Sequence, residues 1–174
     1  MNLPQIARKA IEFYFDNKKF EPDEKTKQKY REKKACFVTL TENDELRGCI
    51  GSLEARQELW KDVVENAVNA GFSDFRFFPL NKSELKKIKI EVSVLTEPKK
   101  LEFKNEKELF EKLNKSMGVI LKKGFYTSTF LPQVWEELPD KIEFLEHLSI
   151  KAGLNKDAWK NAEIFYYNVE IFRE

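Results

Sequence analysis

The alternation of residues 88–94 is the feature that most constrains the fold of this chain. Ile88, Ile90, Val92 and Val94 alternate with Lys89, Glu91 and Ser93. A period of two puts the apolar side chains on one face of a β-strand and the polar ones on the other. We therefore expect a half-buried strand. Glu91 and Ser93 become site residues if another part of the chain covers their face, and otherwise they are ordinary solvent-facing positions.

Two predicted hairpins and a closing strand complete the β-structure. Residues 35–41 and 45–53 are rich in β-formers and are separated by Asn43-Asp44, which favours a hairpin with a two-residue turn. Residues 118–123 and 126–131 predict a second hairpin around Gly124, and residues 163–173 predict the closing strand. Strands joined as hairpins pair antiparallel, so the sheet should be at least partly antiparallel.

Helices are expected between these strands. Residues 3–16 and 57–72 carry apolar side chains at spacings of three and four, and Asn81, Asn105 and Asp140 each precede a Glu by three residues, as in a capping box. Residues 17–34 are polar and predict a solvated connector. The pattern predicts an α+β fold, with a mixed, partly antiparallel sheet flanked by helices, in a single domain over residues 1–174.

Composition narrows the classes of function. The formal net charge is +1, and the basic run from Lys25 to Lys34 holds a single aromatic residue, Tyr30, so nucleic-acid binding is disfavoured. Two cysteines and the lack of a long apolar run predict a cytoplasmic protein without a membrane partner. Abundant Lys and Glu are typical of the ion-pair networks of thermophilic proteins, which makes a thermophilic source a candidate.

The segment Leu46-Arg47-Gly48-Cys49-Ile50-Gly51, called the hexapeptide below, is the first candidate site. Arg47 and Cys49 are two residues apart, so in a regular strand their side chains lie on the same face. A guanidinium beside a thiol favours the nucleophilic thiolate, and the catalytic candidates are therefore Cys49 and Arg47. Gly48 and Gly51 would leave bare backbone for a ligand or an anion. The alternative is a buried structural cysteine between glycines that mark a bulge.

The hairpin register bears on disulfide formation. With a two-residue turn at Asn43-Asp44, Val38 faces Cys49 and Cys36 faces Gly51. The two cysteines are then diagonal neighbours about 7–8 Å apart, beyond the usual disulfide span, so we expect free thiols.

Other candidates are weaker. Asp74 and Arg76 lie two apart among aromatic residues that would anchor the loop, either as cleft residues or as a structural ion pair. The single histidine, His147, falls in a row with Glu143 and Lys151 that is typical of a charged solvent face, so no general base is evident. No metal-ligand spacing, phosphate-binding loop or dinucleotide fingerprint occurs, and we expect no metal and no cofactor.

Several motifs together resemble one family. The hexapeptide, residues 69–77 (NAGFSDFRF), residues 91–95 (EVSVL) and residues 130–135 (FLPQVW) resemble the AMMECR family, whose prokaryotic members are called AmmeMemoRadiSam system protein A. The resemblance implies an α+β fold of a larger and a smaller subdomain, with the hexapeptide near the cleft between them. It also implies a pathway shared with a radical SAM enzyme and a Memo-like protein, but no settled reaction.

These observations lead to two hypotheses of function. In the first, the protein binds a small anionic or acyl-type ligand, or a modified substrate, and whether it is an enzyme stays open. In the second, it is a noncatalytic module linked to gene expression that binds a protein or a nucleic acid. The candidate ligand-binding or cleft residues are Gly48, Gly51, Asp74, Arg76, Glu91, Ser93 and Gln133.

Overall fold

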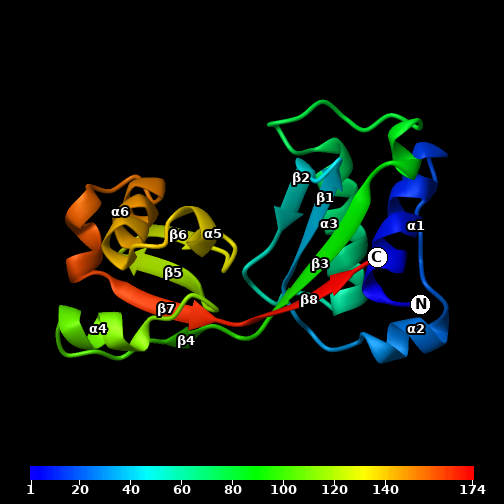
Figure 1. The fold of residues 1–174 in the computed structure, drawn as a ribbon. Coiled ribbons are helices and arrows are strands. Elements are labelled where there is room, and N and C mark those ends of the chain that lie inside the picture. Colours follow the sequence, from blue (N-terminus) through cyan, green and yellow to red (C-terminus); the bar gives the residue numbers. More distant parts are fainter. The chain divides into compact units, whose positions relative to one another are not determined.

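The computed structural model describes residues 1–174 and confirms the α+β class (Figure 1). The chain divides into two compact units, the first comprising residues 1–95 and 170–174 and the second residues 96–169. Each unit contains its own four-stranded sheet and its own hydrophobic core. The strands that the sequence predicts are therefore distributed over two sheets. No helix is long and apolar enough to cross a bilayer.

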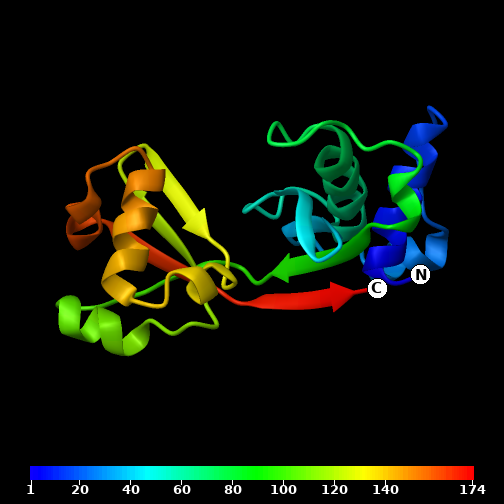
Figure 2. The same cartoon turned by 45° about the horizontal axis from the view of Figure 1, so that its top comes forward.

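The sheet of the first unit has the strand order β2-β1-β3-β8, and helices cover one of its faces (Figures 1 and 2). Both neighbours of β1 in the sheet, β2 and β3, pair with it antiparallel, and β3 confirms the strand predicted from the alternation of residues 88–94. The elements of this unit are α1 (Leu3–Phe15), α2 (Glu24–Lys29), β1 (Cys36–Glu42), β2 (Glu45–Gly51), α3 (Leu59–Phe72), the 3-10 turn η1 (Glu84–Lys86), β3 (Lys89–Leu95) and β8 (Val169–Arg173).

The two long helices of the first unit follow from the sequence. Asn2 caps α1 in a reciprocal capping box with Gln5, and the apolar stripe of α1 packs on α3 and on the sheet. The capping box at Asn81 leads only to η1, because the strand β3 begins soon after it and Glu84 is held by Arg47. The expected α-helix at this position is replaced by a single 3-10 turn.

The second unit has the strand order β4-β7-β5-β6. Its core contains Trp135 stacked on Phe144, with ring centroids 3.5 Å apart, and Phe130 edge-on to Phe144. The elements are β4 (Lys99–Lys100), α4 (Glu106–Lys112), β5 (Gly118–Lys123), β6 (Tyr126–Phe130), α5 (Val134–Glu137), α6 (Lys141–Lys151), the 3-10 helix η2 (Lys156–Asn161) and β7 (Glu163–Tyr167). The caps predicted at Asn105 and Asp140 begin α4 and α6.

The predicted closing strand is in fact two strands. β7 ends at Tyr167 and pairs with β5, whereas β8 begins at Val169 and joins the sheet of the first unit. Asn168 separates them, and its backbone exchanges hydrogen bonds with Thr96. A period-two pattern does not reveal which sheet a strand joins, so this break is not visible in the sequence.

Candidate functional site

Cys49 lies on the sheet face of the first unit that is turned away from α1 and α3. Its cross-strand partner on β1 is Thr39, and the partner of Thr39 on β3 is Glu91. The Thr39 hydroxyl and the Cys49 thiol are 3.3 Å apart, and the Cys49 side chain is partly buried. Cys49, Thr39 and Glu91 therefore form a row across three strands. We call this the cysteine row.

A β-bulge changes the predicted hairpin register. Asn43 and Asp44 both have positive φ, as a two-residue hairpin turn requires, and the pairs next to the turn are as predicted. Leu40 then faces Gly48 while Thr41 faces Leu46, so Arg47 is the extra residue of the bulge. Beyond it Thr39, not Val38, opposes Cys49, and Phe37, not Cys36, opposes Gly51.

The corrected register puts the two cysteines on opposite faces of the sheet. Cys36 is fully buried, with the residues that pack against α1 and α3, while Cys49 points to the other face. Both are free thiols. The two thiols cannot form a disulfide because their side chains lie on opposite faces of the sheet, and not because of the diagonal separation expected from the sequence.

The expected pairing of Arg47 with Cys49 is wrong. The bulge directs Arg47 to Glu84, whose carboxylate accepts its Nε at 2.6 Å, and to the carbonyl oxygen of Phe78 at 3.0 Å. The guanidinium also lies 6.0 Å from the centre of the Phe77 ring. Arg47 thus joins the hexapeptide to the segment after α3, and its charge is neutralised by a carboxylate.

The two glycines of the hexapeptide make room for the chain itself. A Cβ at Gly48 would lie 2.2 Å from the backbone oxygen of Ala70, so β2 and α3 pack closely at this point. A Cβ at Gly51 would lie 2.3 Å from the Phe37 ring. The space that we expected a ligand to use at these positions is occupied by α3 and by Phe37.

Asp74 and Arg76 cover the free edge of β2. Asp74 accepts the backbone N–H of Cys49 at 2.9 Å, and Arg76 donates to the carbonyl oxygen of Cys49 at 3.2 Å. The two side chains also pair with each other at 2.7 Å. Since β2 is an edge strand, this pair replaces the neighbouring strand that its backbone lacks. The N–H expected to bind an anion is thus bound by the carboxylate of Asp74.

The aromatic residues around Asp74 and Arg76 do not all anchor their loop. Phe77 lies under the two guanidiniums of Arg47 and Arg76. Phe75 and Phe78 are 95% and 90% exposed, so two large apolar side chains project into solvent from the loop that carries Asp74 and Arg76. This corrects the expectation that the aromatics anchor the loop.

Electrostatics at the site favour a protonated thiol. Burial raises the pKa of Cys49, and the nearby carboxylates of Asp74 and Glu91 add to the increase, while the Thr39 hydrogen bond and Arg76 oppose it. Hydrogen bonds from Arg76 and from the Cys49 N–H lower the pKa of Asp74 to about 2. The pKa of Cys49 is therefore shifted opposite to the direction that Arg47 was expected to produce.

Glu91 and Ser93 lie on the same face as Cys49, as their parity predicts. The Glu91 carboxylate accepts Arg173 Nε at 2.8 Å and the Ser93 hydroxyl at 3.3 Å. Ser93 is 1% exposed, whereas the Arg173 side chain is 69% exposed. Arg173 and Thr39 were not selected from the sequence, because only the tertiary structure places Thr39 within the cysteine row and Arg173 beside Glu91 at its end.

A polar cluster around Cys36 was also missed. Asp62 on α3 accepts the Cys36 N–H at 3.0 Å, the Ser52 hydroxyl at 2.9 Å and the Asn66 amide at 3.0 Å. Asp62 is 5% exposed and Asn66 is 6% exposed. Both lie among the apolar positions of α3 with a spacing of four, and this sequence signal could have identified them. The cluster ties α3 to β1 and to the segment after β2.

The remaining candidates lie in the second unit. Gln133 precedes α5 and is exposed, and His147 is an exposed residue of α6. The structure contains no group of three or more His, Cys, Asp or Glu side chains placed to hold a metal ion.

The fold and the site define an α+β protein of two units with a free cysteine on a capped edge strand. The chain belongs to the AMMECR1 family, whose family model matches residues 4–172. It is 44% identical to protein MK0488 of Methanopyrus kandleri over 99% of this chain and 86% of that protein. It is 40% identical to protein NEQ441 of Nanoarchaeum equitans over 100% of this chain and 99% of that protein.

A solved structure shares this fold. The crystal structure of the uncharacterised protein PH0010 from Pyrococcus horikoshii superimposes with a TM-score of 0.90, at 35% sequence identity. The match covers 99% of this chain and 89% of that chain.

Proposed function

We propose that this AMMECR1-family protein binds a small anionic or acyl-type ligand, or a modified substrate, at the cysteine row. The ligand belongs to a pathway shared with a radical SAM enzyme and a Memo-like protein. The observation that carries the proposal is the position of Cys49 between two partly exposed guanidiniums. Arg76 is 45% exposed next to Cys49, and Arg173 is 69% exposed next to Glu91 at the other end of the row.

Both arginines keep donors for a ligand. A guanidinium carries five N–H donors, and the hydrogen bonds of Arg76 use its Nε and Nη2 while that of Arg173 uses its Nε. Guanidinium donors suit carboxylate and phosphate oxygens, which they bind through charge-assisted hydrogen bonds. This supports an anionic group near either end of the cysteine row.

The electrostatics support binding over nucleophilic catalysis. A thiol with a raised pKa is mostly protonated at neutral pH, and the thiolate is the nucleophile. The hydroxyl of Thr39 is no general base, and the Glu91 carboxylate is bound by Arg173 and Ser93. In this proposal Cys49 contributes contact area and a weak hydrogen-bond donor to the bound ligand.

An untargeted metabolite screen by mass spectrometry tests the proposal. Wild type, Cys49→Ser and Arg173→Gln are incubated with a cell extract, and the small molecules that each retains are compared. Arg56→Gln is the matched control, because Arg56 is 78% exposed and pairs only with Glu54. We expect wild type and Arg56→Gln to retain an anionic metabolite that Arg173→Gln loses. Equal retention by Arg173→Gln, or no retention by wild type, contradicts the proposal.

A second candidate function is that of a noncatalytic interaction module linked to gene expression. Phe75 and Phe78 favour it, because exposed aromatic side chains are typical contact residues of protein interfaces. Changing both to Ser would then abolish capture of a partner protein and leave the metabolite screen unchanged. A nucleic-acid partner predicts an affinity that falls steeply with salt, which a titration at two ionic strengths would detect.

A further inference from the structure

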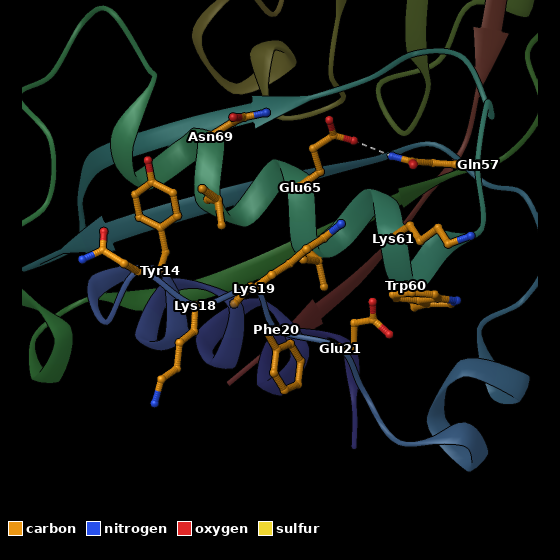
Figure 3. A pocket seen from close by; sticks show the side chains of 14 residues that line it. Tyr14, Lys18, Lys19, Phe20, Glu21, Gln57, Trp60, Lys61, Glu65 and Asn69 are labelled. Carbon is orange, nitrogen blue, oxygen red and sulfur yellow. Dashed lines mark hydrogen bonds between the residues drawn. The ribbon is translucent and has the colours of Figure 1, made fainter.

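A pocket on the helical side of the first unit has no role in the site described above. It lies between the end of α1, residues 17–21 and one side of α3, and its volume is about 730 Å³ (Figure 3). Ligand pockets commonly measure about 300–1,000 Å³. The cysteine row lies on the sheet face that points away from these helices, so the pocket is a separate feature.

The end of α1 creates one wall of the pocket. Asn17 has a φ of 54°, and the chain turns back there, with the N–H groups of Asn17 and Lys18 bonded to the carbonyls of Tyr14 and Phe13. The returning segment places Phe20 against Phe13, with ring centroids 5.2 Å apart. The turn thus holds a polar segment over the apolar side of α3.

The walls of the pocket combine aromatic and aliphatic side chains. Phe20 and Trp60 are each 8% exposed, and Val64 and Val68 line the pocket from α3. Ala10 lies on α1, where its small side chain leaves space beneath the turn. These surfaces can cover an apolar body such as a fused ring or an alkyl chain.

Some polar side chains of the pocket have partners within the protein and are called occupied, and the others are called unoccupied. Glu21 pairs with Lys27 at 3.1 Å, Lys61 pairs with Glu58 at 2.9 Å, and Glu65 accepts the Gln57 amide at 2.7 Å. The unoccupied groups have no side-chain hydrogen bond and no ion pair. They are Tyr14, Asn17, Lys18, Lys19 and Asn69, together with the indole Nε1–H of Trp60.

Lys19 carries the charge best placed for a ligand. Figure 3 shows its side chain extended across the pocket toward α3, while Lys18 points outward. The only carboxylates that line the pocket are Glu21 and Glu65, and neither pairs with Lys19. An ammonium group beside apolar walls and free amides is complementary to an anion attached to an apolar body.

We propose that this pocket binds a small organic carboxylate with an aromatic or aliphatic body. The apolar body lies against Phe20, Val64 and Trp60, and the carboxylate pairs with Lys19. The amides of Asn17 and Asn69 and the hydroxyl of Tyr14 provide further hydrogen bonds. The site is independent of the proposed function, because it shares no residue with the cysteine row.

Calorimetric titration with 2-naphthoate, 2-naphthamide and decanoate tests the proposal. The two naphthalene probes differ in charge, so their comparison isolates the carboxylate. We expect the two carboxylates to bind, and 2-naphthamide to bind about tenfold more weakly, as for the loss of one charge-assisted hydrogen bond. Lys19→Gln should weaken naphthoate by a similar factor, and Lys25→Gln, which removes an exposed lysine outside the pocket, should not.

The location of binding is read from the indole N–H signals in an NMR spectrum. The chain has three Trp, of which only Trp60 lines the pocket, and Trp60→Phe assigns its signal. We expect naphthoate to move this signal alone, and Val64→Trp to abolish binding by filling the pocket. Cys49→Ser should bind naphthoate like wild type, even if the ligand proposed at the cysteine row is never found.

Three results would overturn the proposal. One is the absence of saturable binding by both carboxylates at millimolar concentration. Another is equal affinity for naphthoate and naphthamide together with an unchanged Lys19→Gln variant. The third is binding that persists in a folded Val64→Trp variant, with a circular dichroism spectrum and a melting transition close to wild type.

Discussion

The carboxylate of Asp74 accepts the backbone N–H of Cys49 at 2.9 Å, with Arg76 completing the contact at the Cys49 carbonyl. The free edge of β2 is thereby closed by two side chains from the segment after α3. The N–H and C=O of Cys49 bond to Asp74 and Arg76 and therefore point away from β1. Cys49 and Thr39 are thus a non-hydrogen-bonded pair, and the side chains of such a pair lie close together. The same contact therefore protects the strand and positions the thiol.

Replacing Asp74 should destabilise the first unit. Asp74→Ala removes a carboxylate that is 2% exposed, which leaves the Cys49 N–H without its acceptor and the Arg76 guanidinium without its ion-pair partner. We expect a loss of about 2–4 kcal/mol in the free energy of unfolding, measured by urea denaturation. The control is Glu54→Ala, which removes an exposed ion pair and should leave the urea midpoint unchanged. Equal midpoints for the two variants would show that the cap contributes nothing to stability.

Stability should depend on pH through Asp74 in the acid range. Its folded pKa is about 2 and its ordinary value is 3.8, so the unfolded chain binds more protons between these values. The stabilisation is complete above about pH 5 and is lost as pH falls through about 2. Urea midpoints between pH 5 and 2 should therefore decrease more steeply for wild type than for Asp74→Asn. Parallel curves would contradict the lowered pKa.

The Cys49 thiol should react slowly with alkylating agents. Burial raises its pKa, so little thiolate exists at neutral pH, and the rate with iodoacetamide should be below that of a free cysteine peptide at pH 7.5 and rise with pH. Cys36, which is fully buried beside Asp62, should react only after unfolding. Mass spectrometry of Cys36→Ser and Cys49→Ser separates the two sites. A rate above that of the peptide would restore Cys49 as a candidate nucleophile.

Two glycine substitutions should differ in cost. Gly48→Ala would place a Cβ 2.2 Å from the Ala70 oxygen, and only a shift of β2 or α3 relieves that contact. We expect it to cost about 2–3 kcal/mol, as overpacked cores do. Gly71→Ala meets the flexible end of Leu80 at 2.9 Å and gains helix propensity, so its net effect should be small. Thermal melting compares the two variants, and similar melting temperatures would be inconsistent with close packing at Gly48.

Local sequence patterns predicted much of the secondary structure. The alternation of residues 88–94 gives β3, the apolar stripes give α1 and α3, and the caps at Asn105 and Asp140 give α4 and α6. These features depend on neighbours along the chain, which is why propensity and periodicity identify them. Which sheet each strand joins depends on long-range pairing, and local periodicity does not reveal it.

The candidate site illustrates the same division. The sequence identified the hexapeptide and drew attention to Asp74 and Arg76, all of which lie in the first unit. Strict alternation along β2 predicted that the Arg47 side chain lies beside the Cys49 thiol. The bulge at Arg47 shifts the register, so the residues from Gly48 to the end of β2 oppose other partners on β1 than predicted. Thr39 and Arg173 enter the site only through strand pairing.

The sequence by itself determined the α+β class, the family, and the presence of a cysteine between two glycines beside a polar strand face. Only the tertiary structure decided what surrounds that cysteine. Backbone preferences and burial act locally, whereas the Arg47–Glu84 pair, the contact of Asp74 with Cys49 and the close approach of Gly48 to α3 join segments 22 or more residues apart. Burial raises the pKa of the Cys49 thiol, and a protonated thiol suits a binding residue better than a nucleophile.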